Sequence, residues 1–211
     1  MYSILTVTTA ATSYDLTELS DVKDELGVKD GTSDTILQRY ISSASLAAMQ
    51  YCNRTFAVET LSEQFFADHP NRMVRGGVKP LQLSRWPLIA GSTIVTEDST
   101  LLVENTDYLV DKTNGQLTRL DASGLSVYWH PLPLTVVYSA GYATIPLDVE
   151  DAIIRMVTRR FASKGRDPNL KQQNVPGVIE QSWWISTGTD SGNMSPDITD
   201  MLDNYRPPLT A

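Results

Sequence analysis

Two stretches with helical periodicity, one on each side of a long region of short β-type runs, constrain the fold of this chain more than any other feature. The first covers residues 34–53, where Leu37, Ile41, Ala44 and Ala48 recur at intervals of three and four. This spacing places the apolar side chains on one side of a helix of about five turns. The sequence therefore predicts a long helix with one buried face.

The second stretch covers residues 149–163, where acidic residues come first and basic residues last. This order suits the helix dipole. Two shorter helices are also expected. One spans residues 20–26 and is closed by Gly27 in a left-handed conformation, and the other spans residues 196–205 and has Pro196 in its first turn.

Between residues 57 and 142 the pattern changes to short runs rich in β-branched and aromatic residues, separated by Gly, Pro and Asx residues. Asn114 and Gly115 tolerate positive φ angles and predict a tight hairpin between two of these runs. The predicted strands are 60–67, 81–84, 92–96, 108–111, 116–120 and 134–139.

These patterns predict an α+β fold with a mainly helical core, formed by a short helix, a long helix, a second long helix and a short C-terminal helix. We expect a core domain at residues 1–163, with a β-rich insert at 57–142, and an extended tail at 164–211 that ends in the short helix. Periodicity is lost between residues 165 and 195, which is long for a connection within a compact domain. This stretch is either flexible or built for a partner.

Composition narrows the class of function. The 211 residues carry a net charge of −8, which argues against a broad surface that grips DNA phosphates. Cys52 is the only cysteine, so it cannot form an internal disulfide and favours a reducing compartment. Neither a secretory signal nor an unbroken apolar run of about 18 residues occurs, and we expect a soluble protein without a membrane segment.

The sequence does not point to catalysis. His69 and His130 stand alone in their segments, and neither is placed to share a metal with Cys52. Motifs of the G-x-S-x-G type and phosphate loops ending in G-K-[ST] are missing. We therefore expect no enzymatic activity, no cofactor and no metal site.

Two aromatic features have more than one interpretation. Trp183 and Trp184 are adjacent in the aperiodic stretch, and either pack on the protein's own core or anchor a protein interface. Near the C-terminus, Tyr205, Arg206 and Leu209 offer an aromatic ring, a forked donor and an apolar end. They are either part of a frayed terminus or part of a docking peptide.

The order of the elements resembles that of the head–tail connector (adaptor, head-completion) proteins of long-tailed bacteriophages and gene-transfer particles. The resemblance covers about Leu16 to Phe161 and the short terminal helix. The segments that carry it are Tyr51-Cys52-Asn53-Arg54-Thr55-Phe56, Arg85-Trp86-Pro87-Leu88-Ile89, Tyr108-Leu109-Val110-Asp111, Gly115-Gln116-Leu117, Val136-Val137-Tyr138-Ser139-Ala140-Gly141-Tyr142 and Pro146-Leu147-Asp148-Val149.

The resemblance implies a structural adaptor in the virion neck, assembled in the host cytoplasm. It implies a ring, commonly of twelve copies, beneath the portal protein. The ring would extend the DNA channel and carry a stopper or tail-completion protein, and double-stranded DNA would pass through it without specific binding. Together with the interface argument, it makes Trp183, Trp184, Tyr205, Arg206 and Leu209 the candidates for docking to the portal. The alternatives are another neck protein (a stopper or tail-completion factor) and, less favoured, a small-molecule-binding α+β domain.

Overall fold

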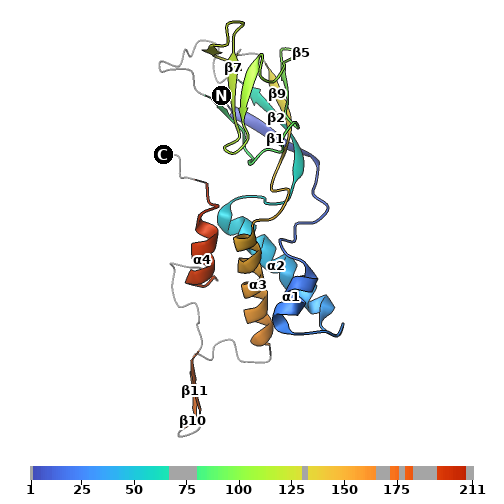
Figure 1. Ribbon diagram of the computed structural model, residues 1–211, viewed down its shortest axis with the longest axis vertical. Coiled ribbons are helices and arrows are strands. Elements are labelled where there is room, and N and C mark those ends of the chain that lie inside the picture. The colour runs from blue at the N-terminus through green and yellow to red at the C-terminus, as the bar shows by residue number, and fades with distance from the viewer. Residues whose placement is uncertain are drawn as a thin grey trace. The chain divides into compact units, whose positions relative to one another are not determined.

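The computed structural model forms two compact units, each built from two separate stretches of the chain. The β unit comprises residues 1–13 and 55–144, and the helical unit comprises residues 14–54 and 145–211 (Figure 1). The expected division into 1–163 and 164–211 is a different one and stays a prediction. The residues that the structure describes are 2–66, 80–129, 133–164, 172–175, 179–182 and 194–207.

The larger sheet of the β unit has five antiparallel strands in the order β1-β2-β9-β4-β5. Along β2 and β9, buried side chains alternate with partly exposed ones, which is the period-two pattern of a sheet with one covered face. These strands are β1 (Tyr2–Thr9), β2 (Glu59–Phe66), β9 (Leu134–Ala140), β4 (Ile94–Glu97) and β5 (Thr100–Leu101).

The smaller sheet is built around the hairpin that the sequence predicts at Asn114 and Gly115. The hairpin is confirmed: its two strands are antiparallel, and Gly115 has a φ of 66°. Asp111 accepts hydrogen bonds from the backbone N–H groups of Thr113 and Asn114, each at 3.1 Å, and these bonds fix the turn. The strands of this sheet are β3 (Leu81–Gln82), β6 (Tyr108–Asp111), β7 (Gln116–Leu120) and β8 (Ser126–Val127).

The two sheets share one hydrophobic core, so the expectation of a mainly helical core is wrong. Most of the strands are short, and each contributes only a few buried side chains. No single β-type run therefore indicates a core in the sequence. The core forms only when the strands pair and bring these side chains together. Its residues are Leu61, Phe65, Leu81, Leu83, Leu88, Val95, Leu102, Tyr108, Leu117, Leu134, Val136, Tyr138 and Ala140.

The described part of the helical unit contains four helices, whose bounds lie within two residues of those that the sequence predicts. α3 contacts each of the other three helices, so its apolar face is the centre of this unit. The fully buried Val22, Leu37, Ile41, Val149 and Ile153 come from α1, α2 and α3. The helices are α1 (Leu19–Leu26), α2 (Asp34–Cys52), α3 (Leu147–Ala162) and α4 (Pro196–Asp203).

The stretch between α3 and α4 includes secondary structure that the sequence pattern does not indicate. It contains an antiparallel pair of strands, β10 (Gln172–Val175) and β11 (Ile179–Ser182), which form a two-stranded sheet of their own. This pair was not predicted from the sequence, and neither were β1, β5 and β8.

Candidate functional site

The C-terminal helix α4 directly precedes two of the predicted docking residues, Tyr205 and Arg206, and it is packed into the helical unit. Ile198 and Leu202 are 2% and 0% exposed, and Met194, just before the helix, is also buried. α4 has only eight residues, and a helix of this length is not stable alone in water. Packing against α2 and α3 therefore keeps it folded.

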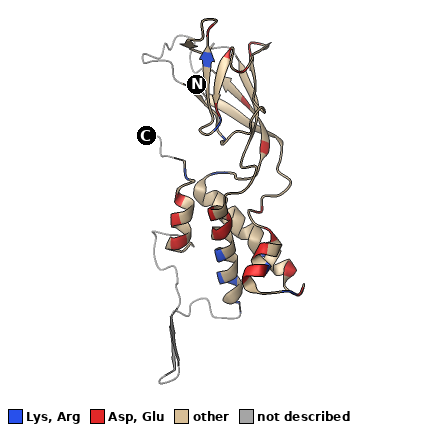
Figure 2. Cartoon of the chain, in the orientation of Figure 1, with Lys and Arg blue, Asp and Glu red and all other residues tan. Residues whose placement is uncertain are grey.

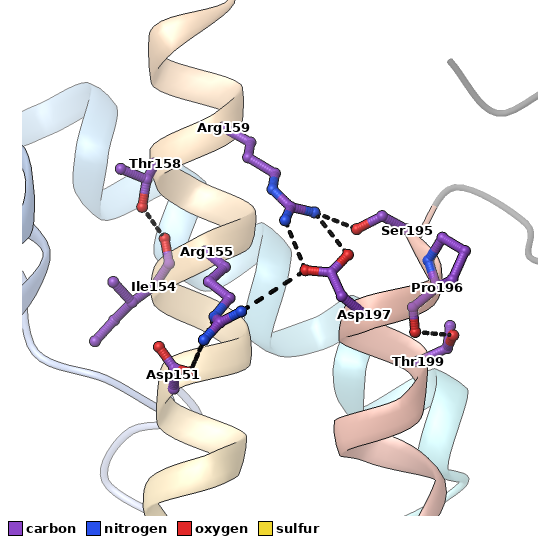
Figure 3. Close-up of polar contacts among 9 residues, drawn as sticks. All are labelled: Asp151, Ile154, Arg155, Thr158, Arg159, Ser195, Pro196, Asp197 and Thr199. Atoms are coloured by element: carbon purple, nitrogen blue, oxygen red, sulfur yellow. Dashed lines mark hydrogen bonds and ion pairs between the residues drawn. The ribbon is translucent and has the colours of Figure 1, made fainter. Parts of the chain in front are cut away.

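A cluster of charged side chains, the first clamp, holds the start of α4 against α3 (Figure 3). The Arg159 guanidinium donates two hydrogen bonds to the carboxylate of Asp197, at 3.0 and 2.6 Å, and a third to the hydroxyl of Ser195. Arg155 lies 3.9 Å from the same carboxylate and forms a second ion pair with Asp151 at 2.8 Å. The paired hydrogen bonds from the Arg159 guanidinium to Asp197 fix the orientation of the first turn of α4 relative to α3.

The first clamp perturbs the titration of Asp197. Hydrogen bonds from Arg159, and then from Ser195, hold the pKa of that carboxyl well below its usual range. Both side chains of the ion pair are about half exposed, at 52% and 41%. Solvent therefore screens the pair, and its net contribution to stability is about 0.2–1 kcal/mol. The buried apolar side chains of α4 contribute more.

A second clamp holds the end of α4. The hydroxyl of Tyr205 donates to Asp148 at 2.6 Å, and the hydroxyl of Tyr51 donates to Asp203 at 2.6 Å. The Arg206 guanidinium stacks 5.1 Å from the centre of the Tyr51 ring and donates to Asp203 at 3.4 Å. The hydrogen bond to Asp203 raises the pKa of Tyr51. These contacts therefore anchor Tyr205 and Arg206, which follow α4, to the helical unit.

The structure brings together only part of the predicted docking set. Tyr205 and Arg206 are adjacent in the second clamp, where both bind side chains of their own chain. Trp183, Trp184 and Leu209 lie outside the described residues. The docking role of the set stays a prediction.

Cys52 lies beside α4, at the end of α2. Its side chain is fully buried, and its Sγ lies 3.5 Å from the carbonyl oxygen of Leu202. Burial raises the pKa of the thiol to about 11, so the thiol is protonated and unreactive at neutral pH. Cys52 is a packing residue.

The β unit contains a buried carboxylate, Glu63, that was not predicted from the sequence. Glu63 is fully buried, and it accepts hydrogen bonds from the Ser84 backbone N–H at 3.0 Å, the Ser84 hydroxyl at 2.6 Å and the Tyr138 hydroxyl at 2.8 Å. Burial, and then the charge of Glu63, raises the pKa of Tyr138. The signal was present, because Glu63 lies between Leu61 and Phe65 in a strand of period two and must share their inward face. This site ties the Ser84 segment to β2.

The described residues contain neither a candidate metal-binding group nor a helix that could span a membrane. No group of three or more His, Cys, Asp and Glu side chains is placed there to hold a metal ion. None of the helices in this part of the chain is long and apolar enough to cross a membrane.

Comparison with known proteins gives one family and a shared fold. Residues 16–76 match the family described as phage gp6-like head-tail connector proteins. No curated protein matches the chain. A chain in the neck of an empty gene transfer agent (GTA) particle, determined with C6 symmetry, has a TM-score of 0.55 at 13% identity. A chain in the virion of the native GTA particle has a TM-score of 0.57 at 13% identity.

A third solved chain, in the neck of the native GTA particle determined with C12 symmetry, has a TM-score of 0.55 at 15% identity. In all three cases the similarity covers 99% of this chain and 97% of the other. At these identities the similarity establishes a shared fold. Together with the family match over residues 16–76, it confirms the resemblance of this chain to the head–tail connector proteins of phages and gene-transfer particles.

Proposed function

We propose that this protein is a structural adaptor of a phage-type virion neck. Copies of the chain form a ring beneath the portal, extend the DNA channel and link the head to a stopper or tail-completion protein. One observation carries the proposal: residues 16–76, which include α1 and α2, match the connector family, and nearly the whole chain shares the fold of GTA neck chains. In this role the protein acts by binding alone, first in the host cytoplasm and then in the virion.

The proposal assigns portal docking to Trp183, Trp184, Tyr205, Arg206 and Leu209. The second clamp supports two different roles within this set: some residues anchor the end of the chain, and the others contact the portal. Tyr205 and Arg206 are bound to the helical unit, so they anchor the end of the chain there. The tryptophans and Leu209 then supply apolar contacts to the portal. Each contact can be weak, because a preassembled portal presents many equivalent sites at once.

The acidic charge suits a ring that DNA must pass through. The chain carries 25 acidic and 17 basic side chains, and acidic side chains lie on all four helices (Figure 2). Carboxylates that line a channel repel phosphates over about one Debye length, which is about 8 Å at physiological salt. DNA would therefore pass without being held.

The test is binding to the portal protein of the same particle, measured by co-sedimentation and electron microscopy. We expect the full chain to form rings on one end of the portal. Replacing Trp183 and Trp184 with Ala should abolish co-sedimentation. Tyr128→Ala is the matched control: it also removes an aromatic side chain, but Tyr128 is 57% exposed and lies outside the docking set, so portal binding should stay intact.

Three results would contradict the proposal. A folded full chain that does not co-sediment with the portal would exclude the adaptor role. A chain that binds only to a preformed portal–adaptor complex would be a stopper instead. A variant lacking both tryptophans that binds the portal normally would refute the docking assignment alone.

A further inference from the structure

The larger sheet of the β unit has one face that carries no charged side chain among its described residues. On the opposite, inner face, the side chains of β2 and β9 are buried in the shared core. The uncharged outer face runs across all five strands. Its residues are Tyr2, Ile4 and Thr6 of β1, Thr60, Ser62, Gln64 and Phe66 of β2, Thr135, Val137 and Ser139 of β9, Ile94 and Thr96 of β4, and Leu101 of β5.

Strand register makes this outer face continuous. Ile4 pairs with Gln64, Gln64 with Thr135, Thr135 with Thr96, and Thr96 with Leu101. One row of uncharged side chains therefore crosses the whole sheet. A second row runs from Thr6 through Ser62 and Val137 to Ile94.

Large apolar side chains on this face are exposed. Tyr2 is 55% exposed, Ile4 is 54%, Ile94 is 51% and Leu101 is 65%. Tyr2 also stacks on Phe66 with 5.2 Å between ring centres, so the β1 end of the face presents a flat aromatic surface. These side chains form two groups, Tyr2 and Ile4 on β1, and Ile94 and Leu101 on β4 and β5. Exposed apolar side chains are common singly, but grouped ones on one face are typical of a binding surface.

The edge of this sheet at β1 is open to pairing. β1 has eight residues, all of them uncharged, and among the described strands it pairs on one side only, with β2. Proteins usually protect exposed edges with charged residues or proline, and β1 has neither. A register shift between Val7 and Thr9 interrupts the far end, while residues 2–7 keep a regular register. About six residues of edge are therefore available to another strand.

We propose that the outer face and the β1 edge bind a second copy of this chain. Charge favours this partner, because two copies with a net charge of −8 repel each other wherever their acidic surfaces meet. The outer face lets two such copies approach without placing like charges together. A strand edge also needs another strand edge as its partner, and a copy of the chain supplies one.

The inference rests on the proposed function, in which the copies form a ring. A ring requires a heterologous contact, in which the β1 edge of one copy pairs with a strand edge other than β1 on the next copy. Pairing of β1 with β1 about a two-fold axis would instead close into a dimer. The β unit thus supplies one side of each contact between neighbours.

The test introduces an acidic side chain into the outer face of the full-length protein. Ile4→Glu places a charge where the proposal requires a neutral contact, at a position exposed enough to leave folding unchanged. Thr6→Glu is a second variant on the same strand. Leu125→Glu is the matched control, since Leu125 is 66% exposed and lies outside the outer face. Circular dichroism and thermal melting check that each variant folds.

Self-association is measured by sedimentation velocity over a concentration series, up to the solubility limit. We expect the wild type and Leu125→Glu to associate equally, and both outer-face variants to associate at least tenfold more weakly. Portal binding of isolated copies should persist in these variants, while cooperative filling of the ring is lost.

The inference fails if the wild type stays monomeric at every concentration and does not fill portal rings cooperatively. It also fails if both folded outer-face variants associate like the wild type. A wild type that binds itself but never binds the portal would refute the proposed function and leave this inference standing.

Discussion

Replacing Leu202 with Ala tests whether α4 is part of the helical core or a peptide that leaves the protein to dock elsewhere. Leu202 is fully buried, and Ile198 on the same helix is 2% exposed. Removing a fully buried leucine side chain from a packed core costs about 2–5 kcal/mol. The exposed ion pair between Arg159 and Asp197 contributes only about 0.2–1 kcal/mol, so it cannot hold an eight-residue helix in place by itself.

We expect Leu202→Ala to lower the free energy of unfolding by about 3 kcal/mol, measured by urea denaturation. If α4 opens separately from the rest, the loss will appear as faster hydrogen exchange in α4, by about a hundredfold for 2.7 kcal/mol. Cys52 gives a second readout, because its Sγ lies beside the Leu202 carbonyl and the thiol should become reactive when α4 opens.

The control is Asp200→Ala, which changes an exposed residue of the same helix and should alter stability by no more than about 0.5 kcal/mol. The reasoning is refuted if Leu202→Ala unfolds at the same urea concentration as the wild type with unchanged exchange in α4. In that case burial of Leu202 would not stabilise the helix.

Three further predictions concern the buried and clamped polar groups. Glu63→Ala should destabilise the β unit by about 3 kcal/mol or more, because three donors lose their acceptor, while Glu63→Gln keeps an oxygen acceptor and should cost less; equal urea midpoints for the two variants would contradict this. Because the pKa of Asp197 is lower in the folded protein, its stabilising effect is complete above its unfolded pKa of about 3.9 and is lost as the pH falls through the folded value. Protection of the α4 amides from hydrogen exchange, measured relative to the intrinsic exchange rate at each pH, should therefore fall in acid, and Asp197→Asn should remove that pH dependence; an unchanged dependence in the variant would exclude this carboxylate as its source. With a thiol pKa of about 11 and full burial, Cys52 should react with a thiol reagent only after unfolding, and a native rate equal to that of a free thiol would disprove its protection.

Elements with a strong local pattern could be predicted from the sequence. α2 follows an apolar stripe and was expected at 34–53, and it spans Asp34–Cys52. β6 and β7 were predicted with their observed bounds, because the turn at Gly115 fixes where both strands end. In these cases the local backbone preference and the tertiary fold agree.

Elements defined by distant partners could not be predicted in this way. β1 is almost entirely exposed, so it shows no alternation, and it is a strand only because it pairs with β2. The inward position of Glu63 conflicts with the usual exposure of a carboxylate, and only its partners Ser84 and Tyr138 explain it. The mainly helical core was wrong for the same reason: pairing between strands creates the core of the β unit.

The candidate site shows the same limit. The residue types of Tyr205 and Arg206 indicate an interaction site, but nothing in the sequence identifies Asp148, Tyr51 and Asp203 as their partners. The pair of Tyr51 and Asp203 is separated by 152 positions in the sequence. Helical periodicity identifies which face of α4 is buried, and it carries no information about which side chains meet at its ends.

The discontinuous construction of the two units restricts how this protein can be made and dissected. Residues 14–54 of the helical unit interrupt the β unit, and residues 55–144 of the β unit interrupt the helical unit. A ribosome therefore releases β1 well before its partner β2, and it releases α2 long before α3 and α4. Each unit must wait for a later segment, which makes folding depend on closing long loops. No single proteolytic cut can free either unit intact, and neither unit can be cloned as one uninterrupted fragment.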